Sequence, residues 1–207
     1  MIQARNLIHK YDFEYALNDV SIDINKGTFV ALSGESGSGK STMLSILSTL
    51  LKPSSGIVLL NGVEVNNIVN IDKFRRENIG FVFQFHHLIQ HLTLRENVEL
   101  AAYGEFKKDL DSIFEKLGIL GIANKYPNEI SGGQRQRAAI ARAIINRPKI
   151  IFADEPTGNL DSKNSINIYE IFKSLCNEGS TIVVASHDIG LKDFVDKTIR
   201  IKDGKIE

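Results

Sequence analysis

The glycine-rich segment at residues 34–41 constrains the fold of this chain more than any other stretch. It reads Gly-Glu-Ser-Gly-Ser-Gly-Lys-Ser and fits the phosphate-loop pattern G-x-x-x-x-G-K-[ST] at every fixed position. The apolar run at 29–32 before it indicates a buried parallel strand, and residues 40–51 indicate a helix. A simple turn rich in glycine and serine would not need this strand–loop–helix context. We therefore expect an α/β domain that binds a nucleoside triphosphate.

The composition of this loop suits the chemistry of phosphate binding. Its glycines allow backbone N–H groups to turn inward around the β- and γ-phosphates, and the helix start behind them adds a favourable dipole. Lys40 is expected to reach the β- and γ-phosphate oxygens, and the Ser41 hydroxyl is expected to coordinate Mg²⁺. The residues predicted to bind the nucleoside triphosphate here are Gly34, Ser36, Gly37, Ser38, Gly39, Lys40, Ser41 and Thr42.

Two adjacent acidic residues, Asp154 and Glu155, follow the apolar run at 150–153. Side chains alternate along a strand, so the two carboxylates need not point at the same atom. Asp154 is placed to hold Mg²⁺, usually through water, and Glu155 is placed to polarise the water that attacks the γ-phosphate. A solvated turn would also carry two acids, but the apolar strand before them and the phosphate loop upstream favour a catalytic site.

A second glycine-rich segment, Ser131-Gly132-Gly133-Gln134, opens a helix predicted at about 133–146. Ser131 can cap this helix, and the glycines let a phosphate approach the backbone N–H groups at its start. The segment therefore has the features of a second phosphate-binding helix start. A single chain can hardly direct both segments at one ATP molecule.

These three motifs, in this order and over essentially the whole chain, resemble those of the ATP-binding-cassette (ABC) ATPases. The resemblance implies ATP hydrolysis with Mg²⁺ by a head-to-tail pair, in which a second copy of the chain is a partner. Each ATP would then be bound by the phosphate loop of one subunit and the Ser-Gly-Gly-Gln signature of the other. The residues implied to act across that interface are Ser131, Gly132, Gly133, Gln134 and Asp161.

The same resemblance assigns roles to three further residues. His187 follows an apolar strand and corresponds to the histidine that contacts the γ-phosphate and orients the attacking water. Gln84 ends another predicted strand, where it can touch Mg²⁺ or the water and link the nucleotide state to the segment behind it. Tyr11 corresponds to the aromatic residue that stacks on adenine, with Tyr15 as its rival.

The resemblance and the periodicity of apolar residues together predict the fold class. We expect one ABC ATPase domain over residues 1–207, with a RecA-like phosphate-loop NTPase core whose sheet is mostly parallel. Residues 1–84 and 149–207 are predicted to form this catalytic core with an N-terminal antiparallel β-subdomain. Residues 85–148, where apolar residues recur at helical spacing, are predicted to form an inserted α-helical subdomain that carries the signature.

Three segments narrow the resemblance to one group within the family. Residues 80–84, 92–98 and 153–161 resemble the group that contains the lipoprotein-release ATPase, the macrolide-export ATPase domain and the cell-division ATPase FtsE. The group implies an integral-membrane permease as partner, with its coupling helix in a groove near Gln84, and export or mechanotransmission as the work performed. The alternative is an FtsE-like regulatory ATPase that signals across the membrane without transport.

The composition argues against several other functions. The chain has 25 Lys+Arg and 25 Asp+Glu, and this zero net charge gives no electrostatic reason for a nucleic-acid partner. No apolar run approaches the roughly 18 residues of a membrane span. We therefore expect no direct membrane insertion, but a cytoplasmic protein held at the inner face of the cell membrane by the permease. Cys176 is the single cysteine, which excludes disulfides and cysteine-based zinc sites.

The sequence leaves alternatives open for one histidine cluster and for the class of protein. His86, His87 and His91 form a cluster beside Gln84, which is either a metal site or, as we favour, a surface that faces the membrane partner. A small-molecule kinase would explain the phosphate loop but neither the signature nor the order of acid and histidine. A DNA-repair ABC ATPase would insert hundreds of residues of coiled coil or zinc modules between loop and signature, for which this chain has no room.

Overall fold

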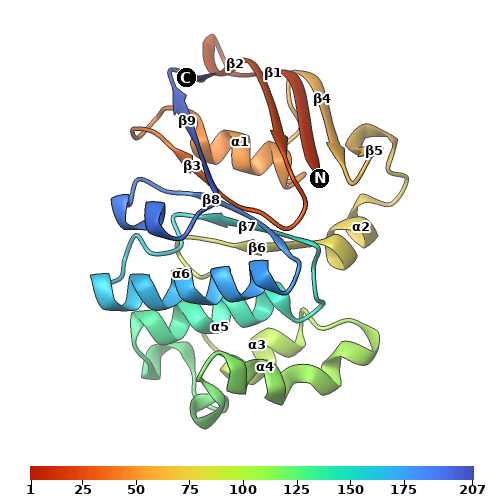
Figure 1. The fold of residues 1–207 in the computed structure, drawn as a ribbon. Helices are drawn as coiled ribbons and strands as arrows, with labels where there is room; N and C mark the ends of the chain where they lie inside the picture. Colours follow the sequence, from red (N-terminus) through yellow and green to blue (C-terminus); the bar gives the residue numbers. More distant parts are fainter.

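A six-stranded sheet runs through the middle of the structure (Figure 1). The computed structural model describes all residues from Met1 to Glu207. The strand order is β10-β9-β3-β8-β7-β6, and all neighbours are parallel except β10 and β9 at one edge. The strands are β3 (Phe29–Ser33), β6 (Ile79–Val82), β7 (Ile150–Asp154), β8 (Thr181–Ala185), β9 (Lys197–Lys202) and β10 (Lys205–Ile206).

Parallel pairing brings the carboxyl ends of four strands to one edge of this sheet. Leu32 of β3 and Asp154 of β7 both pair with Ala185, the last residue of β8. Val82, the last residue of β6, pairs with Ala153 of β7. Ligands bind at this edge in open parallel sheets. The segments that hold the phosphate loop, Gln84, Glu155 and His187 therefore all start next to one another.

A second, antiparallel sheet has the strand order β2-β1-β4-β5. Its strands are β1 (Ile2–Tyr11), β2 (Glu14–Ile24), β4 (Ser55–Leu60) and β5 (Val63–Glu64). Alternation decides its buried face, since Val20, Ile22 and Ile24 are buried while the residues between them are exposed. These side chains share a core of 21 buried residues with helix α1 (Lys40–Leu47), which lies between the two sheets (Figure 1).

Helix α1 is shorter than the sequence pattern predicted. It ends at Leu47 instead of near residue 51, because Thr49 takes a left-handed backbone conformation (φ 67°) that a helix cannot continue. The other helices are α2 (Ile71–Asn78), α3 (Leu94–Glu99), α4 (Leu110–Lys116), α5 (Gly132–Ile144) and α6 (Ser162–Asn177). Short 3₁₀ turns lie at Val65–Asn67, Gly104–Asp109, Leu120–Ile122, Pro127–Glu129 and Ile189–Asp193.

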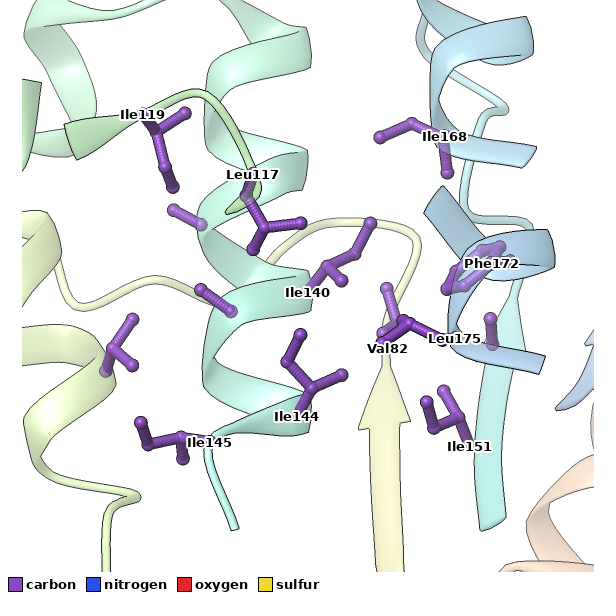
Figure 2. Packing of buried hydrophobic residues seen from close by; sticks show 14 of the residues in the cluster. Val82, Leu117, Ile119, Ile140, Ile144, Ile145, Ile151, Ile168, Phe172 and Leu175 are labelled. Atoms are coloured by element: carbon purple, nitrogen blue, oxygen red, sulfur yellow. The ribbon is translucent and has the colours of Figure 1, made fainter. Parts of the chain in front are cut away.

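One apolar core of 28 buried residues joins the helices between β6 and β7 to the parallel sheet. Figure 2 shows side chains from α6, from β6 and β7, and from α5 meeting in this core: Ile168, Phe172, Leu175, Val82, Ile151, Ile140 and Ile144. Gly80 of β6 permits the close approach of α5. A Cβ at this position would lie 2.5 Å from the carbonyl oxygen of Ala143, so any larger residue would push the helix away.

The antiparallel sheet, the mostly parallel sheet and the helices confirm the predicted fold class. None of the helices combines the length and the apolar character needed to cross a bilayer. Helices α3, α4 and α5 all fall between β6 and β7, as the spacing of apolar residues predicted. The exact boundaries of the helical subdomain stay a prediction.

Asn97 of α3 holds the loop that precedes its helix, and its side chain is buried. Its Oδ1 accepts a hydrogen bond from the N–H of Ile89 (2.7 Å). Its Nδ2 donates to the carbonyl oxygens of Ile89 (3.0 Å), Leu92 (3.1 Å) and Thr93 (2.9 Å). All hydrogen-bonding atoms of this amide are therefore used inside the protein.

We expect Asn97→Ala to lower the free energy of unfolding by about 3 kcal/mol, because it leaves the part-buried N–H of Ile89 and carbonyl oxygen of Leu92 without these hydrogen bonds and removes a buried side chain. Urea denaturation measures the change. Asn67→Ala is the matched control, since Asn67 is exposed, and it should shift the free energy by no more than about 0.5 kcal/mol. Equal effects of the two substitutions would contradict the role given to Asn97.

Candidate nucleotide-binding site

The phosphate loop folds around the side chain of its own lysine. Lys40 is buried, and its Nζ donates hydrogen bonds to the carbonyl oxygens of Gly34 (2.9 Å) and Glu35 (2.6 Å). Gly39 has φ 106°, and a Cβ there would lie 2.3 Å from the carbonyl oxygen of Ala16, so this position requires glycine. The hydrogen bonds of Lys40 thus join the first residues of the loop to the start of α1, where the lysine ammonium group places a positive charge.

A hydroxyl and a carboxylate meet beside this loop. Ser41 Oγ donates a hydrogen bond to Asp154 Oδ1 at 3.0 Å. Burial raises the pKa of Asp154, and the nearby carboxylate of Glu155 raises it further, whereas the Ser41 hydroxyl and Lys40 oppose the change. A half-buried carboxylate of this kind is stabilised in its charged form when a cation lies next to it. The pair supplies the hard oxygen atoms that Mg²⁺ prefers.

Glu155 takes a backbone conformation that is uncommon for a residue with a side chain (φ 42°). Its N–H donates to the carbonyl oxygen of Ala185 (2.9 Å), which extends the pairing of β7 with β8. One carboxylate oxygen accepts from Ser186 Oγ (3.1 Å), and the other lies 2.8 Å from His187 Nδ1. Because an ionised carboxylate can only accept, we assign the donated proton to Nδ1 of His187.

A cleft of about 730 Å³ opens above the phosphate loop. Most of the residues predicted to contact ATP or its attacking water line it: Tyr11, Ser36, Gly37, Gly39, Lys40, Ser41, Thr42, Gln84, Glu155 and His187. Gly34 and Ser38 instead lie on the other side of the loop, beside Arg200 and Ile201. The rival Tyr15 also lines the cleft, and Lys10 Nζ lies 4.2 Å from the centroid of its ring.

The Ser131–Gln134 segment does not line this cleft. Ser131 caps α5, because its Oγ accepts from the N–H of Gln134 (3.3 Å) while Gln134 Oε1 accepts from the N–H of Ser131 (2.9 Å). A Cβ on Gly132 would lie 3.5 Å from Leu160, and one on Gly133 would lie 2.8 Å from Asn164 Oδ1. The signature therefore sits beside the start of α6, away from the chain's own phosphate loop.

Asp161 lies at that same place and caps α6. Its Oδ1 accepts from the N–H of Asn164 (2.9 Å), and its Oδ2 accepts from Asn164 Nδ2 (2.9 Å). These hydrogen bonds, the backbone one first, lower the pKa of Asp161 below its usual value. The five residues predicted to act on a second subunit's ATP are thus gathered at one place, outside the cleft of their own subunit.

A second groove, of about 750 Å³, lies where β6 meets α5. Three large apolar side chains that line it are substantially exposed: Leu50, Leu100 and Tyr103. The guanidinium of Arg76 lies 4.9 Å from the ring centroid of Tyr103. The groove thus combines apolar side chains with cationic ones, and it begins within a few residues of Gln84.

Arg142 of α5 anchors the loop after Gln84 to this groove. Its two terminal nitrogens donate to the carbonyl oxygens of His86 (2.6 Å) and His87 (2.6 Å). Of the three clustered histidines, only His87 lines the groove, and burial lowers the pKa of His86. No group of three or more His, Cys, Asp or Glu side chains is arranged to hold a metal ion.

A buried tyrosine near the site was not predicted from the sequence. The hydroxyl of Tyr169, on α6, lies 2.7 Å from Thr157 Oγ1 and 2.7 Å from Asp188 Oδ2. Ser186 and Asp188 flank His187 in the sequence, so their position near the site could have been inferred from that of His187. Tyr169 gives no such signal, because it falls on the apolar stripe of α6 and has the spacing of a core residue.

The fold and the cleft define a class of protein. A phosphate loop between β3 and α1, with two acids, a glutamine and a histidine at the ends of neighbouring parallel strands, is the arrangement of a phosphate-loop ATPase domain.

Comparison with known proteins identifies the family. The family model described as ABC transporter matches residues 17–158. The ABC transporter ATP-binding protein MJ0796 of Methanocaldococcus jannaschii is 44% identical over 100% of this chain and 95% of its own length. A dimeric structure of the MJ0796 cassette bound to ADP and Pi matches with a TM-score of 0.91 at 41% identity, covering 100% of this chain and 97% of that one. The chain belongs to the ABC transporter family and is an ATP-binding subunit with ATPase activity.

Two further relatives bear on the group within the family. The lipoprotein-releasing system ATP-binding protein LolD of Bacteroides thetaiotaomicron is 38% identical over 100% of this chain and 99% of its own. The macrolide export ATP-binding/permease protein MacB of Campylobacter jejuni is 42% identical over 100% of this chain and 33% of its own. These relatives confirm the predicted resemblance to that group, and they do not favour the FtsE-like alternative. The roles of individual residues stay predictions.

Proposed function

We propose that the protein closes with a second copy of itself around two ATP molecules and thereby drives a membrane permease. The separation of the two phosphate-binding helix starts carries this proposal. Helix α1 opens on the cleft, whereas α5 starts beside Leu160 and Asn164, outside it. In a head-to-tail pair, Ser131–Gln134 and Asp161 of one subunit meet the ATP of the other. Each ATP site is then complete only in the dimer.

Within one subunit, the phosphate loop and Lys40 bind the phosphates, and Tyr11 stacks on adenine. Tyr11 is preferred over Tyr15 because the Lys10 ammonium already lies over the ring of Tyr15. The residues that would hold Mg²⁺ are Ser41, Asp154 and Gln84, whose hydroxyl, carboxylate and amide oxygens suit this ion. When bound, the ion would neutralise charge on the phosphoryl group that is transferred.

Glu155 and His187 act on the attacking water. The carboxylate of Glu155 is positioned at the cleft as the base that polarises this water. His187 donates through Nδ1 to Glu155, which fixes its ring. In the neutral ring Nε2 is then an acceptor that can orient the attacking water, whereas a hydrogen bond to a γ-phosphate oxygen requires a proton on both ring nitrogens. After hydrolysis, charge repulsion between ADP and phosphate favours opening of the pair.

Closure is transmitted to the permease through the helices that follow Gln84. ATP shifts the pair toward the closed form only to the extent that it binds this form more tightly. Residues 85–148 move with the closing subunit, and the apolar groove beside Arg142 holds the permease's coupling helix. On this proposal the protein works in the cytoplasm, held at the inner face of the cell membrane by the permease. LolD belongs by name to a lipoprotein-releasing system and MacB to macrolide export, which favours export as the work performed. Mechanotransmission rests on the resemblance of residues 80–84, 92–98 and 153–161 to that group.

Substitution of Ser131 tests the head-to-tail arrangement. Asp and Asn both cap a helix as well as Ser does, so neither variant should unfold α5. Ser131→Asp places a negative charge where the second subunit's γ-phosphate is proposed to bind. We expect it to lower the rate of ATP hydrolysis about 30-fold through charge repulsion, while the affinity of a single subunit for ATP is unchanged.

Ser131→Asn is the matched control, and it should be clearly more active than Ser131→Asp. Phosphate release at several protein concentrations measures the rate, and binding of a fluorescent ATP analogue measures the affinity. Equal activity of the Asp and Asn variants would remove Ser131 from the phosphate site. A loss of ATP affinity in the isolated subunit would place Ser131 in its own cleft instead.

A further inference from the structure

A chain of hydrogen bonds behind the cleft joins Tyr169 to Glu155. Tyr169 Oη lies 2.7 Å from Asp188 Oδ2, and the N–H of Asp188 donates to Ser186 Oγ at 3.1 Å. Ser186 Oγ in turn donates to Glu155 Oε2 at 3.1 Å. The same tyrosine hydroxyl lies 2.7 Å from Thr157 Oγ1, two residues beyond Glu155. One arm therefore reaches the Glu155 carboxylate, and the other ends two residues after Glu155 in the same turn.

The donors in this chain can be assigned from chemistry. The Asp188 carboxylate has no proton to give, so Tyr169 donates its single hydroxyl proton to it. Thr157 must then donate to Tyr169 Oη. Asp188 Oδ1 also accepts from the N–H of Gly190 (2.8 Å), which fixes the orientation of the carboxylate. Burial raises the pKa of Tyr169, so the phenol keeps this proton.

Tyr169 lies on a helix, whereas its two hydrogen-bond partners lie in turns. It lies on α6, a helix of 16 residues, is only 1% exposed, and its ring centroid lies 5.5 Å from that of Phe194. Thr157 belongs to the turn after β7, and Asp188 to the turn after β8. Tyr169 does not line the ATP cleft, but it lines a neighbouring cavity of about 520 Å³ together with Glu155 and His187. Its hydroxyl is hydrogen-bonded to the two turns that carry these residues.

We infer that Tyr169 is a positioning residue that holds Glu155 and His187 in register for hydrolysis. Glu155 has a left-handed backbone conformation (φ 42°), which persists only when the surrounding structure holds it. The hydrogen bond between Thr157 and Tyr169 holds the backbone two residues after Glu155 and so stabilises this conformation. The Tyr169–Asp188 hydrogen bond does the same for the turn that carries His187. This inference rests on the catalytic roles proposed for Glu155 and His187.

Tyr169→Phe removes only the hydroxyl and is the first test. The kcat for ATP hydrolysis should fall about tenfold, as for a misplaced catalytic group, while the Kd for ATP changes by less than about twofold. Tyr126→Phe is the matched control because Tyr126 is exposed and does not line the cleft, and its kcat should stay at the wild-type value. A Tyr169→Phe enzyme with wild-type kcat, or with kcat and affinity reduced together, overturns the inference.

Two further variants keep the test valid if Tyr169→Phe folds poorly. Thr157→Val removes the hydroxyl that donates to Tyr169, whereas Thr157→Ser keeps it. The Val variant should lose about as much kcat as Tyr169→Phe, and the Ser variant should stay within about threefold of wild type. Similar kcat values for the two Thr157 variants would overturn the inference.

A double variant separates this inference from the proposed function. In a His187→Ala background, addition of Tyr169→Phe should lower the residual rate by about threefold instead of tenfold, since only the effect that acts through Thr157 and Glu155 remains. A full additional tenfold loss would show that Tyr169 does not act on His187 and would overturn the inference. Wild-type activity of His187→Ala itself would instead remove the catalytic role on which the inference rests.

Discussion

Glu155→Gln is expected to lower the rate of ATP hydrolysis about 1,000-fold while leaving ATP binding intact. The amide has the shape of the carboxylate but cannot take a proton from water, and a general base contributes on the order of 10² to 10⁴ in rate. Ser186 Oγ can still donate to the side-chain oxygen, and the amide NH₂ group then faces His187 Nδ1, which accepts when the ring takes its other neutral tautomer. With hydrolysis blocked, the closed pair should accumulate. Phosphate release measures the rate, and sedimentation velocity measures the dimer in ATP-Mg²⁺ and in ADP.

Glu178→Gln makes the same chemical change at a remote position and serves as the control. Glu178 pairs with Lys116 (2.5 Å) and does not line the cleft. We expect this variant to hydrolyse ATP at the wild-type rate. A Glu155→Gln protein that keeps a tenth or more of the wild-type activity would remove Glu155 from catalysis. A fully inactive variant that stays monomeric with ATP would agree with the catalytic role of Glu155 but contradict the proposed ATP-bound dimer.

Lys40→Ala should weaken ATP binding itself by about 300-fold. Loss of one buried, hydrogen-bonded charge at a binding site costs roughly 2–5 kcal/mol, and about 3.4 kcal/mol corresponds to this factor. The phosphates would lose their cation, and the carbonyl groups of Gly34 and Glu35 would lose their donor. Titration with a fluorescent ATP analogue measures the dissociation constant.

The control for Lys40→Ala is Lys52→Ala, which removes the same charge from an exposed position. It should bind ATP with wild-type affinity, which separates the loss of a specific contact from the loss of net charge. Thermal unfolding without nucleotide shows whether the phosphate loop survives in Lys40→Ala. A Lys40→Ala protein that folds normally and binds ATP as tightly as wild type would contradict the assignment.

Much of the fold could be predicted because its elements leave strong local signals. Continuous apolar runs indicated the buried strands β3 and β7, and the apolar strand before His187 indicated β8. Strand β9 was missed although Ile199 and Ile201 alternate with exposed residues, because a strand near the sheet edge with charged neighbours has a weak pattern. The end of α1 was also placed too late, since the left-handed conformation of Thr49 has no signal in the sequence.

The candidate site also has parts that could be predicted from the sequence and parts that could not. Motifs whose chemistry is local, such as the phosphate loop, could be found from spacing alone. The separation of Ser131 from the cleft could be argued only through the family resemblance, and the structure gives it a geometric basis. Tyr169 could not be found at all, because its function depends on three segments that are distant in sequence and meet only in the folded chain.

The contact between Gly80 and Ala143 limits how the helices after β6 can respond to nucleotide. Helix α5 rests directly on the backbone of a strand, and its other side chains share a continuous core with the sheet. Lifting the helix away would open a cavity, whereas sliding it a short way along the strand exchanges one set of apolar contacts for another. The structure therefore favours a shear movement over hinge bending, because no side chain at Gly80 obstructs the helix as it slides. A methyl group at this position would collide with the backbone of α5 and hinder that movement.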